Sequence, residues 1–499
     1  MRLSGLIAAL WLAFAQTAAA DGPLRVGMIA MPPAQANPYF TTATTPNMFY
    51  PALYDTLTMV DESGEVVPQV AQSWERVDDL TWRFRLRDDV VFSTGEPVTA
   101  ETVAGVLAHL QSDAFAAQSI TREFRMLKSA RVVSEFEVEL TTAWPHALLP
   151  RYLSFFYLAP PDYVTQVGLQ GLANEPVGSG PFVLDDWQAE RVLLSPNPRS
   201  WQPAHVSAME ALVLPTPTAR LQAVVTDRID VAYALGPDDE ATLRANGLGL
   251  YMRNPVRILV MGFNAVKEGS PFADVRIRRA VNHAVNRKAI TDALMGGYVE
   301  PATQPVPKGS IGYDPELEGY AYDPDKAKAL LAEAGYPDGF DVIYEVTAGA
   351  SSMTDAYSQQ VAADLARVGI RMEVRPILFT DAVQKMTRGG WEGTMFSTDF
   401  ATGPSMDGLR PFRLHSCGWS APWYCDADAE PLYEQARVAP DRETREGLTR
   451  QLVRRYLDQA SALYLFPALG LDGLGKRIVQ WKTLNDRPLY HEARVKDAE

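Results

Sequence analysis

The chain has 499 residues, of which 46 are lysine or arginine and 61 are aspartate or glutamate, so its formal net charge at pH 7 is −15. So acidic a surface repels the phosphates of nucleic acid, and the composition therefore disfavours DNA or RNA as a partner. Hydrophobic residues make up 47% of the chain, which excludes a largely disordered protein and suffices for two or three domains with separate cores.

Residues 1–20 have the pattern of a secretory signal peptide. Arg2 supplies a short positive start, an apolar stretch runs from Leu6 to Ala15, and the alanines at 18–20 form a small-residue cleavage site before Asp21. The apolar stretch is shorter than the roughly 20 residues that span a bilayer, so a membrane anchor is the less favoured alternative. The sequence therefore predicts an exported protein.

Strand and helix patterns alternate through most of the chain, which predicts an α/β fold. Apolar and arginine side chains alternate over residues 82–87, as in a half-buried strand, in the segment LTWRFRLRDDVVF. A helix is expected to follow Thr99. Another is expected between Asp323, as its N-cap, and Gly335, as its left-handed C-cap.

A further helical segment begins at Asp274 and carries apolar side chains on one face. Its arginines are expected to face water: Arg276, Arg278 and Arg279. Proline-rich stretches at 160–161 and 215–217 are candidate crossings between lobes of the molecule.

The two cysteines of the chain, Cys417 and Cys425, lie close together. One close pair in an exported protein predicts a disulfide, and a metal or redox pair is less favoured because the spacing is not C-x-x-C. The loop encloses Trp419, Trp423 and Tyr424. These aromatic side chains could stack on a ligand, or they could anchor the loop to the core; the sequence leaves both open.

Motifs for catalysis are mostly absent. The segment GLDGLGKR resembles a phosphate-binding loop, but Arg477 stands where a serine or threonine would hold magnesium. Ser179 lies in VGSGPF without the G-x-S-x-G elbow, and this segment predicts a tight turn with a close backbone approach. The six histidines form no H-x-x-x-H pair. The sequence therefore predicts a protein that is no enzyme and needs no cofactor or metal.

Two carboxylates, Asp399 and Asp407, stand out because glycine and proline make their segment a loop. A loop carboxylate that loses water can hold the ammonium group of a ligand. A solvated turn is the simpler alternative on sequence alone.

Several segments together resemble the dipeptide/oligopeptide/nickel family of bacterial solute-binding proteins, known as solute-binding family 5. The resemblance is carried by VPQVAQSWERVDDLTWRFRLRDDVVFSTGEPVTAETV, VGSGPFVLDDW, PTPTARLQAVVTDRIDVAYAL, GFNAVKEGSPFADVRIRRAVNHAVNRKAI and YDPDKAKALLAEAGYPDGF. They follow one another in the expected order over nearly the whole chain after residue 20, and this order makes the resemblance specific.

The resemblance implies a periplasmic-binding-protein type II fold, with two α/β lobes joined by a hinge and an additional inserted domain. Lobe I is expected to comprise 21–50, 175–258 and 471–499; the additional domain comprises 51–174, and lobe II comprises 259–470. A peptide or peptide-like ligand is expected in the interlobe cleft. The protein would be a periplasmic monomer that delivers this ligand to the inner-membrane permease of an ABC importer.

Peptide-binding relatives carry a loop aspartate that pairs with the ligand's amino terminus, and the altered segment here leaves Asp399 or Asp407 for that place. Arg410 and Arg413 could pair with a ligand carboxylate or could only neutralise the acidic loop. His415 resembles the histidine of nickel-binding relatives and makes a metal chelate the alternative ligand. Rival roles are an exported hydrolase that uses the two aspartates as paired carboxylates, and a sensor.

Overall fold

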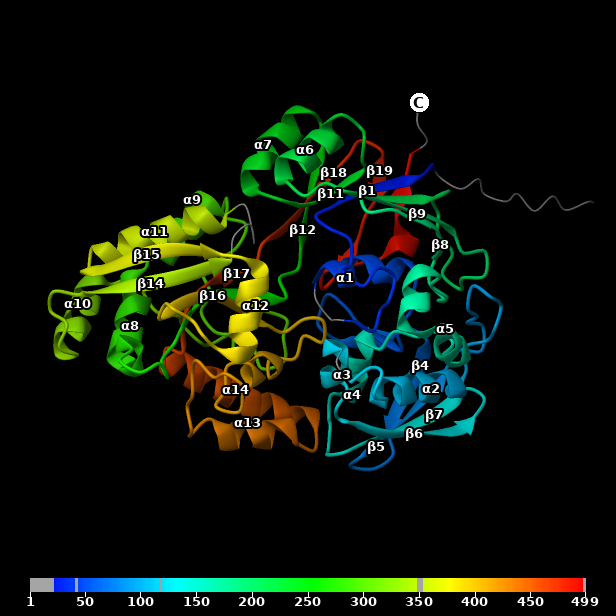
Figure 1. The fold of residues 1–499 in the computed structure, drawn as a ribbon, viewed down its shortest axis with the longest axis horizontal. Helices are drawn as coiled ribbons and strands as arrows, with labels where there is room; N and C mark the ends of the chain where they lie inside the picture. Colours follow the sequence, from blue (N-terminus) through cyan, green and yellow to red (C-terminus); the bar gives the residue numbers. More distant parts are fainter. Residues whose placement is uncertain (1–21, 41–43, 117, 348–352, 497–499) are drawn as a thin grey trace, which may run out of the picture.

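The computed structural model describes residues 22–40, 44–116, 118–347 and 353–496. The predicted signal peptide, residues 1–20, lies outside this part of the chain. Three main sheets with helices packed on them confirm the predicted α/β class (Figure 1). Across the described ranges, no helix is both long enough and apolar enough to cross a membrane.

A seven-stranded sheet forms the core at the upper right of Figure 1. Its central strand β1 runs parallel to β10 and β11, while the outer pairs are antiparallel. Helices α6 (Pro217–Val225) and α7 (Glu240–Ala245) pack near β11 and β12. In sheet order the strands are β12 (Gly249–Arg253), β18 (Gly470–Leu474), β11 (Val231–Leu235), β1 (Leu24–Met28), β10 (Met209–Val213), β9 (Arg191–Pro196) and β8 (Phe182–Trp187).

A five-stranded sheet forms the second lobe, at the left of Figure 1. Strand β14 runs parallel to β15 and β16, and β13 is antiparallel to β16 and β17. The strands, in order, are β15 (Ile370–Ile377), β14 (Phe340–Thr347), β16 (Met395–Ala401), β13 (Arg257–Phe263) and β17 (Ala462–Pro467). The helices of this lobe are α8 (Val275–Ala284), α9 (Arg287–Leu294), α10 (Pro324–Glu333), α11 (Thr354–Ala366), α12 (Phe379–Arg388), α13 (Glu430–Arg437) and α14 (Arg442–Asp458).

A four-stranded antiparallel sheet lies at the lower right of Figure 1 and carries α2 (Ala100–Gln111) and α5 (Pro161–Asn174). Its apolar side chains, such as Phe84 and Leu140, share one buried cluster with Val26 of the seven-stranded sheet. The strands are β4 (Ala71–Arg76), β5 (Thr81–Leu86), β7 (Glu137–Thr142) and β6 (Leu127–Ser134). Shorter elements are α1 (Thr44–Phe49), β2 (Thr58–Val60), β3 (Val66–Pro68), α3 (Ser119–Glu123), α4 (Leu149–Tyr152), β19 (Ile478–Gln480), β20 (Thr483–Leu484), β21 (Arg487–Pro488) and β22 (Arg494–Val495).

The chain crosses twice between the two large sheets, through residues 254–256 and 468–469. The proline-rich stretches predicted as crossings lie elsewhere, because Pro161 and Pro217 occupy the first turns of α5 and α6, where the fixed φ of proline suits a helix start. The domain boundaries proposed from the sequence stay a prediction.

Two helix predictions have different outcomes. Asp323 accepts a hydrogen bond from the Lys326 amide at 2.9 Å, and Gly335 has a φ of +91°, so both predicted caps are confirmed. The prediction that Arg278 faces water is wrong. Its guanidinium is buried and donates to the carbonyl oxygens of Phe272 at 2.7 Å and of Gln459 at 3.0 Å, because the segments before α8 and after α14 cover this face.

The glycine turn around Ser179 makes the close backbone approach that the sequence predicts. A Cβ atom at Gly178 would lie 2.0 Å from the Leu53 carbonyl oxygen. The Ser179 hydroxyl donates to the Asp55 carboxylate at 2.8 Å, which holds the turn against residues 53–55.

We therefore expect Gly178→Ala to lower the stability of the protein by about 1–3 kcal/mol or more, because neither backbone segment can move away without breaking its hydrogen bonds. Gly447→Ala is the matched control. It lies inside α14 with no atom within 4 Å of its new Cβ, and should be neutral or stabilising. Thermal denaturation of both variants measures the effect, and an unchanged melting temperature for Gly178→Ala would contradict it.

Candidate functional site

The carboxyl ends of the parallel strands in both large sheets lie at the two crossings. In the first lobe Leu235 of β11 pairs with Leu471 at the start of β18. In the second lobe Ala401 of β16 pairs with Arg257 at the start of β13. In open α/β sheets, ligands bind in the crevice outside the carboxyl ends of the strands. The facing edges of the two sheets are therefore the candidate ligand site.

The prediction that Asp399 lies in a loop is wrong, because pairing with β13 extends strand β16 to Ala401. Asp399 lies at this edge on β16, beside Arg257 on β13. The side chains are 33% and 38% exposed, and Arg257 Nη1 lies 3.7 Å from Asp399 Oδ2. Asp399 thus keeps a solvent-accessible carboxylate at the edge that faces the other lobe. The predicted ligand role of Asp399 stays a prediction, and this position supports it.

Asp407 is fully buried and is engaged by other residues of the chain. Arg445 Nη2 donates to Oδ2 at 2.6 Å, the Tyr152 hydroxyl donates to the same oxygen at 2.9 Å, and the Leu409 amide donates to Oδ1 at 3.0 Å. Burial acts to raise the pKa of Asp407, but the charge and hydrogen bond of Arg445 outweigh it and lower the pKa. These partners favour a structural role for Asp407, between α4 and α14.

Arg410 and Arg413 both contact Glu123, at the end of α3. Arg410 Nε lies 3.2 Å from Glu123 Oε2, and Arg413 Nη2 lies 3.2 Å from Oε1. Burial acts to raise the pKa of Glu123, but the two guanidinium groups lower it. The arrangement favours neutralisation of a carboxylate over ligand binding. Glu123 lies just before β6 of the four-stranded sheet, so the two arginines neutralise a carboxylate outside their own loop.

The disulfide between Cys417 and Cys425 is confirmed, with Cα atoms 4.4 Å apart. Trp423 is 1% exposed and Tyr424 is 3% exposed, and both belong to a buried cluster of the second lobe. The Trp419 indole donates to the Met386 carbonyl oxygen at 2.7 Å. These contacts favour the anchoring alternative for the loop; stacking on a ligand stays a prediction.

His415 uses both ring nitrogens inside the protein. The Trp423 indole can only donate, so Nδ1 accepts its hydrogen bond at 3.3 Å and Nε2 donates to the Asp399 carbonyl oxygen at 3.0 Å. The ring stacks on Phe400, and burial lowers the pKa of His415 to about 4, so the imidazole is neutral. In the part of the chain that the structure describes, no three His, Cys, Asp or Glu side chains gather where they could hold a metal ion.

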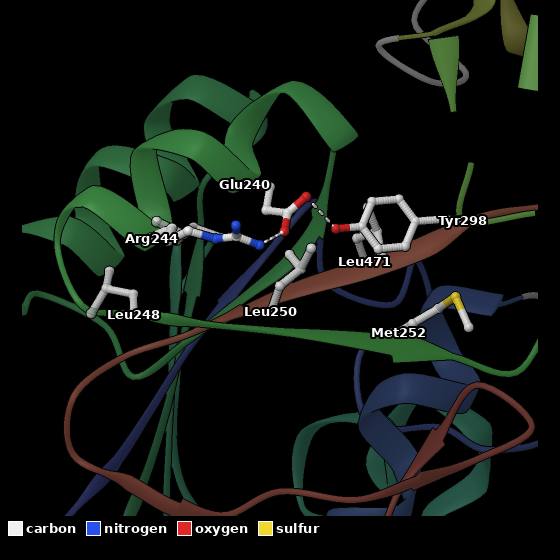
Figure 2. Close-up of a pocket in the computed structure, with 8 residues that line it drawn as sticks. Glu240, Arg244, Leu248, Leu250, Met252, Tyr298 and Leu471 are labelled. Carbon is white, nitrogen blue, oxygen red and sulfur yellow. Dashed lines mark hydrogen bonds and ion pairs between the residues drawn. The ribbon is translucent and has the colours of Figure 1, made fainter. Parts of the chain in front are cut away.

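A hollow of about 280 Å³ lies between α7, β12 and the segment after α9 (Figure 2). The Tyr298 hydroxyl donates to Glu240 at 2.5 Å, and this hydrogen bond joins the two lobes across the hollow. None of the predicted ligand residues lines this hollow. Tyr298 and Glu240 are 58 residues apart in the chain, and no local sequence pattern indicates their contact. The lining is mostly apolar: Leu243, Leu248, Leu250, Met252 and Leu471, together with Arg244.

Residues 65–419 match the family model described as bacterial extracellular solute-binding proteins, family 5 Middle. The chain is 27% identical over 516 residues to the di/tripeptide-binding protein 2 of Pseudomonas aeruginosa, with 94% of each chain covered. It is 28% identical over 375 residues to the nickel-binding periplasmic protein of Escherichia coli K12, with 68% of each chain covered.

One similar solved structure is the ABC transporter-associated periplasmic binding protein DppA from Helicobacter pylori in complex with peptide STSA. The two folds agree with a TM-score of 0.80 at 20% identity, over 96% of this chain and 99% of that chain. This likeness confirms the predicted periplasmic-binding-protein type II fold, in which two α/β lobes are joined by a hinge and accompanied by an additional domain.

Proposed function

Because the chain belongs to the bacterial extracellular solute-binding proteins of family 5, we propose that it captures a peptide or peptide-like compound between its lobes for an ABC importer. The observation that carries this proposal is the pair of short crossings, at which the carboxyl edges of both sheets face each other. Two crossings side by side form a hinge. A ligand that contacts both edges favours the closed arrangement of the lobes.

The remaining parts of the role follow from the same proposal. The protein acts in the periplasm after removal of residues 1–20, as a monomer that presents both lobes to the permease in the inner membrane. It releases its ligand unchanged. The rival hydrolase is disfavoured, because Asp407 is buried and bonded to Arg445 and cannot serve as one of two paired catalytic carboxylates.

The ligand's ammonium group binds Asp399 in this proposal. A charge-assisted hydrogen bond to a partly desolvated carboxylate is roughly twice as strong as a neutral one. The likeness to the di/tripeptide-binding protein of Pseudomonas aeruginosa supports a ligand that carries such an amine. The likeness to the nickel-binding protein of Escherichia coli supports a metal chelate instead, but the hydrogen bonds of both His415 nitrogens oppose that alternative.

A thermal-shift screen of residues 21–499 tests the proposed function. The panel holds amino acids, di- to pentapeptides, amino-acid conjugates, nickel–histidine and short oligosaccharides. A ligand present at about 100 times its dissociation constant adds about 2.7 kcal/mol of stability, so we expect a bound amine to raise the melting temperature by about 1 °C or more.

Asp399→Asn should weaken that binding by about 1.5–3 kcal/mol with the fold intact, and mass spectrometry should recover the ligand uncleaved. If only nickel–histidine raises the melting temperature, and His415→Ala abolishes that rise, the ligand is a metal chelate and not a peptide-like amine. The absence of any shift would overturn the proposed function.

A further inference from the structure

Arg257 and Asp399 lie on the same face of two neighbouring antiparallel strands. Arg257 pairs with Ala401, and Asp399 pairs with Leu259, so the two charged side chains are diagonal neighbours across β13 and β16. Diagonal neighbours on one face lie within reach of each other's long side chains. Both residues stand at the edge that faces the first lobe, next to the crossing at 254–256.

The charged groups of Arg257 and Asp399 do not form a hydrogen-bonded ion pair, and in this the pair differs from nearby ion pairs. The nearest nitrogen–oxygen distance between the two side chains is 3.7 Å, longer than a hydrogen bond. In the pair of Arg445 and Asp407, by contrast, Arg445 Nη2 lies 2.6 Å from Asp407 Oδ2, within hydrogen-bond distance. In the described ranges, neither the guanidinium of Arg257 nor the carboxylate of Asp399 has a hydrogen bond within the chain, and each is about one-third exposed.

We propose that Arg257 and Asp399 together bind an α-amino-acid head group, with the ligand's carboxylate on Arg257 and its ammonium on Asp399. This inference rests on the proposed function and names the class of its ligand. The guanidinium offers parallel N–H donors that match a carboxylate in two-point geometry. The four groups then alternate in charge around a small ring, so each ligand charge lies next to an opposite charge of the protein.

The spacing of the pair selects between two kinds of ligand. In an α-amino-acid head group, the ammonium nitrogen and the carboxylate oxygens are attached through one carbon and lie about 3 Å apart. This span fits protein charges that lie 3.7 Å apart. In an ordinary α-linked peptide, each further residue separates the two terminal charges by up to roughly 3.3–3.6 Å more. Arg257 and Asp399 therefore favour side-chain-linked compounds, such as γ-glutamyl peptides, over α-linked peptides.

Two isomers test the inference directly: γ-glutamylglycine, which keeps a free head group, and α-glutamylglycine, which has the same atoms and charge without one. We expect calorimetric titration to show that the γ-isomer binds at least tenfold more tightly. Arg257→Gln and Asp399→Asn should each weaken γ-isomer binding at least tenfold, with melting temperatures close to that of the wild type.

The matched control is Arg371→Gln, which removes an exposed arginine paired with Asp341 at the opposite end of strands β14 and β15 in the same sheet. Its affinity should equal that of the wild type. Equal or tighter binding of the α-isomer, or unchanged γ-isomer affinity in Arg257→Gln, would overturn the inference and leave the proposed function intact. Absence of binding by both isomers and by every compound of the thermal-shift panel would overturn both.

Discussion

Replacing Arg445 by methionine should lower the free energy of unfolding of its lobe by about 3–5 kcal/mol, because the variant leaves Asp407 buried without its counter-charge. Arg445 is 2% exposed and Asp407 is fully buried, so water cannot replace the lost partner. The remaining donors to the carboxylate, the Tyr152 hydroxyl and the Leu409 amide, carry no charge. Urea denaturation followed by circular dichroism measures the loss.

The pH dependence of this effect has a defined sign. The lowered pKa of Asp407 in the folded wild type means that its stabilisation is present above the unfolded-state pKa and is lost as the pH falls through the folded value. In Arg445→Met the charge of Arg445 no longer offsets the burial that acts to raise the pKa of Asp407, so protonation of the carboxyl at acid pH relieves the defect. The stability difference between the two proteins should therefore narrow as the pH falls.

Arg371→Gln again provides the control, since its partner Asp341 is 77% exposed. An exposed pair contributes about 0–1 kcal/mol, and its loss should show no comparable change. A loss below 1 kcal/mol in Arg445→Met at neutral pH would contradict the role assigned to the buried pair.

Truncating Trp423 to alanine should cost about 3–5 kcal/mol of stability, the range for a fully buried aromatic side chain. Trp423 packs edge-on against Phe396 at 5.3 Å between ring centroids, and its indole donates to His415. The truncation leaves a cavity beneath the disulfide-closed loop and removes the partner of His415 Nδ1. Thermal and urea denaturation measure this change.

Trp423→Phe is the matched variant, because it keeps an aromatic ring and most of the side-chain volume while it removes the indole hydrogen bond. Its cost should be about 1–2 kcal/mol. The affinity of either folded variant for its ligand should stay close to that of the wild type, since the side chain is 1% exposed. A large loss of affinity in Trp423→Phe with little loss of stability would instead favour stacking on a ligand.

The sequence by itself determined the features that depend on neighbours along the chain. Local periodicity, backbone preference or short spacing accounts for each of them: the strand β5, predicted over 82–87 and found at Thr81–Leu86, the caps at Asp323 and Gly335, the turn around Ser179 and the pairing of Cys417 with Cys425. Such features arise within a few residues, and the physical rules that govern them need no knowledge of the rest of the molecule.

The tertiary structure alone decided which charges are available for binding. Arg410 and Arg413 meet Glu123 at separations of 287 and 290 residues. Arg278, predicted to face water, is buried instead, because the carbonyl oxygens of Phe272 and Gln459 accept hydrogen bonds from its guanidinium. A charged residue is stable either in water or beside a buried partner, and local pattern does not distinguish these environments.

Arg257 has no motif around it in the sequence, and only the pairing of β13 with β16 places it beside Asp399. The two crossings, at 254–256 and 468–469, lie where consecutive strands belong to different sheets, whereas the proline-rich stretches begin helices. The sequence thus determined the family and the local elements. The packing of distant strands decided the hinge and the exposed charges at it, because burial and partner choice depend on residues that are far apart in the chain.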